Sequence, residues 1–212
     1  MGITIFAQGK LDRIEDIPGL IAELRVLAQG NNWAAHVLDN DFVVQPNAVL
    51  IPRDSGDPGC SIVGSLGLKG ITLQLDPKTE SLPILFDHHG VLTDIMRQVS
   101  WIDSNGQDER FTSCKTQFGE IDSHIRIIKL LDRLKNRYIS NLSVTDEGDF
   151  WDSRDPRILA EKRIALGHYL RHTERVIGSI ESADNDVQDA ETIASRIEEA
   201  LLKAAKEDGS LR

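Results

Sequence analysis

The segment 120–138 is apolar around more than half of its helical circumference, and this feature constrains the fold more than any other. Its apolar positions recur at helical spacing and are filled by Ile121, Ile125, Ile127, Ile128, Leu130, Leu131, Leu134 and Tyr138. A surface helix has a narrower apolar stripe, so the pattern predicts a helix that is covered on most sides. The remaining face is basic and carries Arg126, Lys129, Arg133 and Arg137, with Asp122 among them.

The segments predicted to form strands are grouped together, which favours an α+β fold. Strands are expected at residues 3–6, 33–38, 60–68, 71–75, 82–86, 111–118 and 142–145, and a first helix at about 17–28 that ends near Gly30. Residues 91–101 fit either a strand or a helix. Grouped strands indicate a mainly antiparallel sheet with helices packed on one face. The β-α-β4-α order is similar to the TATA-box-binding-protein-like topology.

A helical extension is predicted after this α+β domain. Asp155 and Pro156 suit the N-cap and first position of a helix that runs to about residue 181. A polar break at 182–186 precedes a last helix to about residue 207. The expected organisation is therefore an α+β domain at 1–152 and a C-terminal helical pair at 153–212.

The charge balance argues against nucleic-acid binding. The chain has 34 acidic and 24 basic side chains, a net charge of −10, and 40% apolar residues. The apolar fraction supports a folded core, whereas phosphate binding needs a positive footprint. No segment approaches the roughly 18 apolar residues that span a bilayer, and the start lacks a signal-peptide pattern. We therefore expect a cytoplasmic protein with no membrane and no nucleic-acid partner.

Two cysteines, Cys60 and Cys114, lie far apart in the sequence and in segments predicted to be strands. This number and spacing argue against a disulfide framework or a cysteine-based zinc site. We expect both to be small buried side chains.

The residues Asp87-His88-His89-Gly90 follow an apolar strand and resemble two phosphoesterase motifs. The first is the opening motif of haloacid-dehalogenase-type phosphatases, which implies Asp87 as a nucleophile assisted by magnesium, although His89 replaces the second aspartate. The second is the signature triplet of a manganese-binding phosphoesterase family. The alternative interpretation is a strand that ends in a turn, with Asp87 and Gly90 as turn residues.

His124 lies within the apolar arc of the 120–138 helix, between Ile121 and Ile128. A buried histidine needs a hydrogen-bond partner, and one interpretation is a bonded core residue. The other is a pocket residue that faces the strand carrying Cys114 and Thr116 and acts as a general base.

Two further groups contain residue types that bind metal ions. The loop 146–152 carries Asp146, Asp149 and Asp152, and clustered carboxylates hold hard cations. His168 and His172 are four residues apart on a predicted helix, which is a metal-ligand spacing. The alternatives are a charged entry to the next helix and a solvated helix face.

Residues 114–152 resemble an uncharacterised family of bacterial proteins. The resemblance is carried by Lys115-Thr116-Gln117-Phe118, His124-Ile125, Ile128-Lys129-Leu130-Leu131, Asn141-Leu142, Asp146-Glu147-Gly148 and Trp151. It implies a bacterial protein and brings no known activity.

The leading functional hypothesis is a non-catalytic protein that binds a partner or itself through the C-terminal helices. It needs no cofactor. The alternative is a hydrolase that uses a divalent metal, with Asp87, His88 and His89 converging on the acidic loop 146–152. A third hypothesis is small-ligand binding in a pocket between sheet and helix near His124. In an acidic chain, the basic face of the 120–138 helix is expected to pair with the protein's own carboxylates.

Overall fold

The computed structural model describes residues 2–53 and 59–181, with side chains as far as residue 171. The elements are β1 Thr4–Gln8, α1 Ile17–Asn31, β2 Ala34–Asp39, β3 Val49–Pro52, β4 Cys60–Val63, β5 Lys69–Gln74, β6 Leu82–Phe86, β7 Leu92–Thr93, α2 Ile95–Asp103, β8 Thr112–Lys115, α3 Ile121–Arg137, β9 Ser143–Asp146, α4 Phe150–Ser153 and α5 Pro156–Glu181. The chain divides into two compact units, 1–160 and 161–212.

All strand pairs in the described residues are antiparallel, so the α+β class with antiparallel sheets is confirmed. One sheet has the order β8-β1-β9 and a second has the order β2-β5-β6-β7. The pair β3-β4 forms a separate ribbon. In the first sheet Ile5 lies opposite Cys114 on one side and Asp146 on the other.

The two larger sheets lie edge to edge along β6 and β8. Pro83 has no backbone N–H, so it cannot donate to a ladder across this edge. The Thr112 hydroxyl instead donates to the carbonyl oxygen of Pro83 at 2.6 Å. Just beyond the strands, the amide of Glu80 donates to the carbonyl oxygen of Lys115 at 2.9 Å. The seam is therefore held by a mixture of side-chain and backbone bonds.

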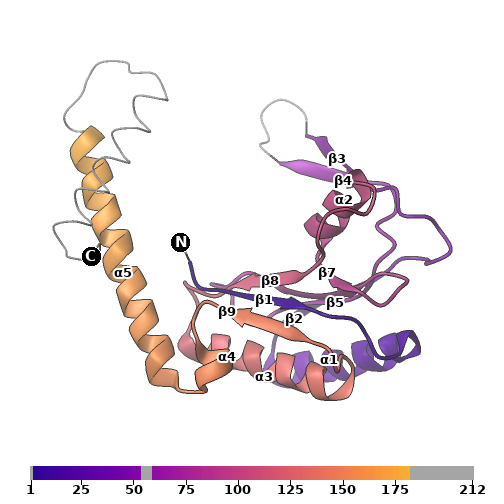
Figure 1. The fold of residues 1–212 in the computed structure, drawn as a ribbon, viewed down its shortest axis with the longest axis horizontal. Coiled ribbons are helices and arrows are strands. Elements are labelled where there is room, and N and C mark those ends of the chain that lie inside the picture. The colour runs from indigo at the N-terminus through magenta and orange to yellow at the C-terminus, as the bar shows by residue number, and fades with distance from the viewer. Residues whose placement is uncertain (1, 54–58, 182–212) are drawn as a thin grey trace. The chain divides into compact units, whose positions relative to one another are not determined.

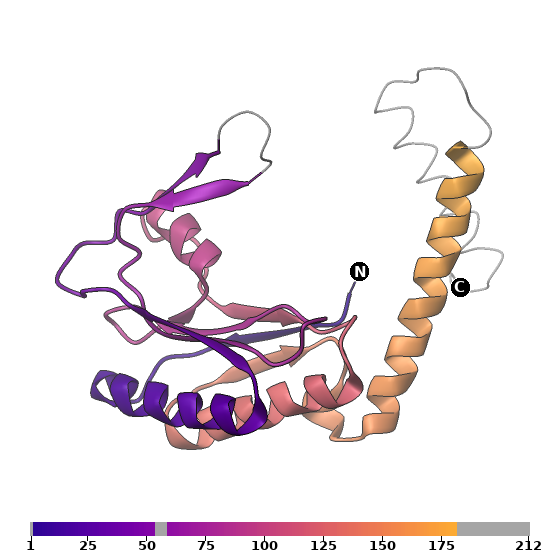
Figure 2. The same ribbon diagram turned by 180° about the vertical axis from the view of Figure 1, so that it is seen from behind.

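Helices α1 and α3 lie on one face of this layer of strands, and α2 and the β3-β4 ribbon lie on the other (Figures 1 and 2). Side chains alternate along the strands accordingly, because successive residues point to opposite faces. Ile5, Ala7 and Cys114 are buried beneath the helices. The opposite face carries the partly exposed Thr4, Phe6 and Ser113.

Helix α3 is covered on most of its sides, as its sequence predicts. Its buried residues are Ser123, His124, Ile127, Ile128, Leu130, Leu131 and Leu134. On its basic face Arg133 and Arg137 form ion pairs with Glu23 of α1, and Arg126 pairs with Asp122. The expected internal pairing of this basic face is confirmed for these three arginines.

Several element boundaries differ from the sequence-based expectation. Helix α1 continues through Gly30 and ends at Asn31, because Asn32 supplies the left-handed cap with φ of 57°. The ambiguous segment 91–101 contains the short strand β7 followed by α2, whose N-cap Asp94 accepts a bond from the amide of Arg97 at 2.8 Å. The strands expected at 60–68 and 111–118 are shorter, and β3 and α4 were not expected.

The expectation for the cysteines is right for one of them. Cys114 is buried, and its thiol donates to the carbonyl oxygen of Glu80 at 3.1 Å. Burial raises the pKa of Cys114 to about 12. Cys60 is exposed, because the strand that carries it belongs to the ribbon rather than to a covered sheet. The helix expected after residue 186 lies outside the described residues.

Candidate functional site

A buried polar chain links Thr116, His124 and Asp146. The Thr116 hydroxyl lies 2.7 Å from Nδ1 of His124, and the ring's Nε2 lies 3.1 Å from a carboxylate oxygen of Asp146. Thr116 follows β8, His124 lies in the first turns of α3, and Asp146 ends β9. Strands β8 and β9 each pair with β1, one on either side of it. This arrangement brings Thr116 and Asp146 beneath α3.

This polar chain of three side chains has the residue types of a nucleophile, a base and a carboxylate, but its burial indicates a structural role. Thr116, His124 and Asp146 are all buried, so no substrate reaches the hydroxyl. The Thr116 hydroxyl also donates to the carbonyl oxygen of Ile3 at 3.2 Å. His124 is thus the bonded core histidine of the first interpretation, and the strand it faces is the one that the sequence predicts.

Asp146 ends this polar chain and accepts bonds from three groups. Burial alone raises its pKa, but the bond from His124, the charge of that ring, and the amides of Trp151 and Gly148 together lower it by more, so the pKa lies below its usual value. Those amides donate at 2.9 and 2.7 Å. A Cβ on Gly148 would stand 2.7 Å from the Leu159 side chain and 3.0 Å from the His124 ring, so a larger residue there would have to displace them.

The acidic loop 146–152 does not gather its carboxylates into one site. Asp146 turns inward to His124, whereas Asp152 is exposed and Asp149 is half-buried. Among residues 2–53 and 59–181, no group of three or more histidine, cysteine or carboxylate side chains is placed to hold a metal ion.

The Asp87 turn is closed by the protein's own groups. Its carboxylate accepts bonds from the amides of His89 and Val91 at 2.9 and 2.8 Å, and it forms an ion pair with Arg110. The Arg110 guanidinium also lies 4.4 Å from the centre of the Trp101 ring. This arrangement is the turn interpretation of the motif, with Gly90 at a φ of 78°.

The Asp87 turn and the acidic loop lie at opposite ends of β1. The amide of Leu11 donates to Gly90 beside the first segment, whereas Asp146 lies opposite Ile5. Leu11 and Ile5 are ~20 Å apart along an extended chain. The structure therefore does not bring these two predicted metal-binding segments together.

The third predicted metal-binding group is the histidine pair of α5. His168 is exposed, and the side chain of His172 lies outside the described residues.

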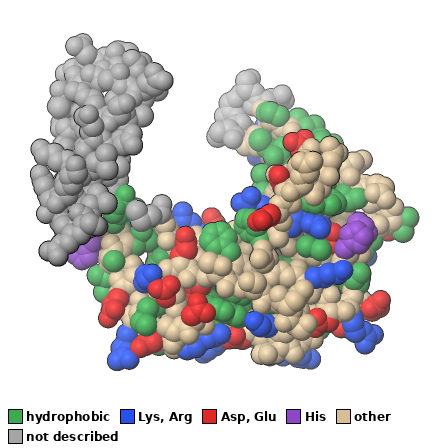
Figure 3. Space-filling model, viewed as in Figure 1, with side chains coloured by type: hydrophobic (Ala, Val, Ile, Leu, Met, Phe, Trp, Pro, Cys, Tyr) green, Lys and Arg blue, Asp and Glu red, His purple; other side chains and the backbone are tan. Residues whose placement is uncertain are grey.

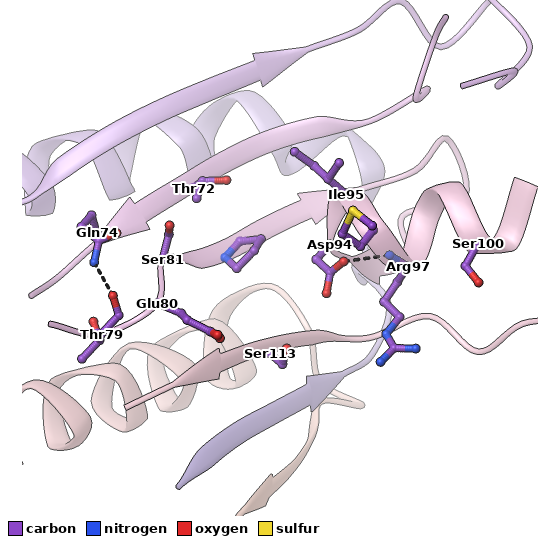
Figure 4. Close-up of a pocket in the computed structure, with 12 residues that line it drawn as sticks. Thr72, Gln74, Thr79, Glu80, Ser81, Asp94, Ile95, Arg97, Ser100 and Ser113 are labelled. Atoms are coloured by element: carbon purple, nitrogen blue, oxygen red, sulfur yellow. Dashed lines mark hydrogen bonds between the residues drawn. The ribbon is translucent and has the colours of Figure 1, made fainter. Parts of the chain in front are cut away.

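A groove of about 780 Å³ lies on the open face of the sheets (Figure 4). Its floor comes from β5, β6 and β8, and its wall is the first half of α2. Polar lining side chains include Thr72, Gln74, Glu80, Ser81, Asp94, Arg97 and Ser113. The Arg97 guanidinium lies over the Phe111 ring, 4.1 Å from its centre, in a cation–π contact. No motif in the sequence marks this groove, because its residues come from four separate segments.

The β3-β4 ribbon is a second feature that the sequence does not reveal. Its apolar residues Val49, Leu50, Ile51, Ile62 and Val63 are between 38 and 51% exposed. Figure 3 shows apolar side chains gathered on this ribbon. Short apolar runs predict buried strands, and only the tertiary structure shows that this pair is uncovered.

Helix α2 joins these two features into one surface. Met96 and Ser100 line the polar groove on one side of α2, and both also line an apolar cavity of about 640 Å³ against Val49 and Leu50. An apolar centre with a polar rim is the usual composition of a protein-binding surface.

Comparison with known proteins adds no relative: no family model, no curated protein and no solved structure matches the chain. No helix in the described part of the chain is long and apolar enough to cross a membrane.

Proposed function

We propose that this is a non-catalytic protein that acts by self-association, and that the β3-β4 ribbon is the contact surface. The proposal rests on one observation: every residue of both strands is exposed, although five of them are large and apolar. An isolated two-stranded ribbon is marginally stable in water, and exposed apolar patches mark interaction sites. A second copy would cover this ribbon.

The hydrogen-bond pattern of the ribbon indicates which edge receives the second copy. The amide of Arg53 donates to Gly59 and that of Asn47 to Ser65, so bonded pairs alternate at odd positions of β3. Ile62 lies opposite Leu50, between bonded pairs, and its N–H and C=O therefore point away from β3. This edge of β4 has no strand partner in the described residues.

The other edge of the ribbon is less suited to pairing. Pro52 lies there, and proline offers no N–H to an added strand.

The ribbon is also suited to self-association by its charge. The residues of β3 and β4 are uncharged, so two copies would meet without like charges at the ribbon, despite a net charge of −10 per chain. Antiparallel pairing of β4 with β4 of a second copy uses the same patch on both chains, as a two-fold dimer requires.

The experiment is the mass of the protein in solution, measured by light scattering and sedimentation over a wide concentration range. We expect a dimer for the natural chain, and a monomer for Ile62→Pro, which removes an outward N–H and leaves the ribbon's own bonds intact. Ile62→Lys should act alike, since an edge lysine opposes strand pairing. Val26→Lys, at an exposed valine of α1, is the matched control and should remain dimeric.

The same measurement separates the ribbon from the C-terminal helices, the interface expected from the sequence. A chain that ends at Ala160 keeps the first unit and the ribbon. A dimer of this shortened chain assigns the contact to the ribbon, and a monomer assigns it to the helices. A natural chain that is monomeric at every concentration rules out both interfaces.

A second candidate function is the binding of a small polar molecule in the groove beside α2. The hydroxyls of Thr72, Ser81 and Ser113 line it and have no hydrogen-bond partner in the described structure, and the Arg97 guanidinium lies over the Phe111 ring. A thermal-shift series with amino acids and sugars tests it. Stabilisation by a compound that Arg97→Gln abolishes supports the groove, and stabilisation that the variant retains places the compound elsewhere.

We also propose that the two larger sheets act as one continuous layer in the order β2-β5-β6-β8-β1-β9. The bonds between β6 and β8 support this proposal. With α1 after β1 and α3 after β8, that order is similar to the TATA-box-binding-protein-like topology. An experimental structure in which β8 separates from β6 would contradict it.

A further inference from the structure

A small pocket lies on the β8-β1-β9 sheet, on the face opposite to α1 and α3. Its volume is about 230 Å³, and it is lined by Phe6, Ala7, Gln8, Phe111, Ser143 and Thr145. None of these residues lines the groove beside α2, so the pocket is a separate site. None of them is charged either, although the chain has a net charge of −10. The pocket therefore suits a neutral ligand.

The strand register gathers the lining side chains on one face. Phe6 of β1 lies opposite Thr145 of β9, and Gln8 lies opposite Ser143. Because successive residues of a strand point to opposite faces, these four side chains all stand on the open face. Phe111, which directly precedes β8, joins them there: its ring centre lies 5.9 Å from that of Phe6.

The two aromatic rings form the apolar part of the pocket. They meet in a T-shaped arrangement with 69° between their planes, and the Arg97 guanidinium lies over the Phe111 ring. Both rings line the pocket and are only partly buried, so a ligand can reach their surfaces. Aromatic side chains in such a position offer a stacking surface to a second flat ring.

The polar part of the pocket consists of three neutral side chains. The amide of Gln8 and the hydroxyls of Ser143 and Thr145 are exposed and make no hydrogen bond within the described part of the chain. Amide and hydroxyl groups both donate and accept hydrogen bonds. A flat ring with donors and acceptors along its edge matches both the aromatic and the polar part.

We propose that this pocket binds a neutral nitrogen heterocycle of the nucleobase kind, carried by a free nucleoside. The ring stacks on Phe6 and Phe111, and its edge bonds to Gln8, Ser143 and Thr145. Pockets for drug-sized ligands begin at about 300 Å³, so this one takes a single ring system, with the sugar left outside.

The test is nuclear magnetic resonance of the full-length, ¹⁵N-labelled protein, titrated with adenosine and with thymidine. We expect the backbone amide signals of β1 and β9 beside the pocket to shift in a saturable way. D-ribose and phenol are the ligand controls, since one lacks the ring and the other lacks the nitrogen edge. No saturable shift with either nucleoside overturns the proposal, and so does equal binding of ribose or phenol.

A deoxythymidine decamer separates a free nucleoside from a nucleic-acid strand. We expect it to bind no more tightly per base than thymidine, because the pocket has no cation to neutralise phosphate. Tighter binding that salt weakens would overturn the assignment to a free nucleoside.

Variants locate the site. Phe6→Leu keeps an apolar side chain, removes the stacking surface and should raise the dissociation constant about tenfold. Phe118→Leu is the matched control, because Phe118 is 64% exposed and does not line the pocket. Equal losses in the two variants overturn the proposal, since they indicate general attraction to aromatic side chains.

A second variant keeps the test decisive if Phe6→Leu does not fold, which its melting temperature shows. Thr145→Val preserves the shape and strand preference of an exposed residue and removes one hydroxyl. It should raise the dissociation constant for the nucleosides several-fold. An unchanged constant would contradict the bonded ring edge on which the proposal depends.

Discussion

His124 uses both ring nitrogens inside the protein, and this makes it a structural residue. Removing the ring takes one of three hydrogen-bond partners from the buried Asp146 carboxylate and the only side-chain partner of the Thr116 hydroxyl in the described residues. We expect His124→Gln to lower the free energy of unfolding by about 2 kcal/mol, as when a buried polar group loses its hydrogen-bond partner. Urea unfolding followed by circular dichroism measures it.

The control for this substitution is His168→Gln on the exposed surface of α5. It should change the free energy of unfolding by less than about 0.5 kcal/mol, as surface changes do. Equal effects of the two substitutions would show that the buried chain contributes nothing specific to stability.

The sequence predicts that His124 is buried but not which residues it contacts. A polar residue inside an apolar helical arc shows burial directly. Its partner Asp146 stands in a cluster of carboxylates, which indicates a metal loop when the residues are considered alone. Their contact depends on β9 lying beside β1, and that pairing is not visible in local spacing.

At the scale of elements, α3 is capped by a residue from a distant turn. Glu120 at its N-cap makes no side-chain cap bond. Instead Asp76, in the turn before β6, accepts bonds from the Glu120 amide at 3.0 Å and the Ser123 hydroxyl at 2.8 Å. The amides of Glu120 and Lys78, followed by the Ser123 hydroxyl, hold the pKa of Asp76 below its usual value.

We therefore expect Asp76→Ala to destabilise the fold by about 1–2 kcal/mol, the range for a lost helix cap. Thermal and urea unfolding test this. Asp39→Ala provides the comparison, because Asp39 forms an exposed ion pair with Lys69 and such pairs contribute less than about 1 kcal/mol. A larger effect at Asp39 than at Asp76 would contradict the capping role.

Helices α1, α3 and α5 were predictable because each has a long periodic pattern, and the ribbon was not. The runs that form β3 and β4 have four residues each, which is too short to show which face is covered. Helix α4 has the same length and interrupts the loop predicted at 146–152. Short elements are decided by their tertiary neighbours.

At the scale of the whole molecule, several paired carboxylates make the free energy of unfolding depend on pH in the acidic range. The pKa values of Asp76 and Asp146 are lowered, and so is that of Glu23, for which burial is outweighed by Tyr138 and two arginines. Each group binds protons more tightly in the unfolded chain, so its stabilisation is complete above about pH 4.5 and declines as the pH falls through the folded values.

We expect the free energy of unfolding to be nearly constant between pH 7 and about pH 5 and to fall steeply below about pH 4. Denaturant unfolding at a series of pH values measures this curve. In Asp76→Asn the fall should be shallower, because one of the linked carboxylates is gone. A natural chain whose stability is unchanged down to pH 3 would contradict the assignment of these pairs.

The strand pairing of β2 with β5 places Asp39 directly opposite Lys69, and the two side chains meet at 2.9 Å. The chain between them, which carries the ribbon, thus leaves the sheet and returns to it at the same point. The segment is an excursion within a hairpin, so a change in its length between the core residues Ala48 and Leu66 would leave the strands that it interrupts paired. Proteins that share this sheet are therefore expected to differ most between these two residues.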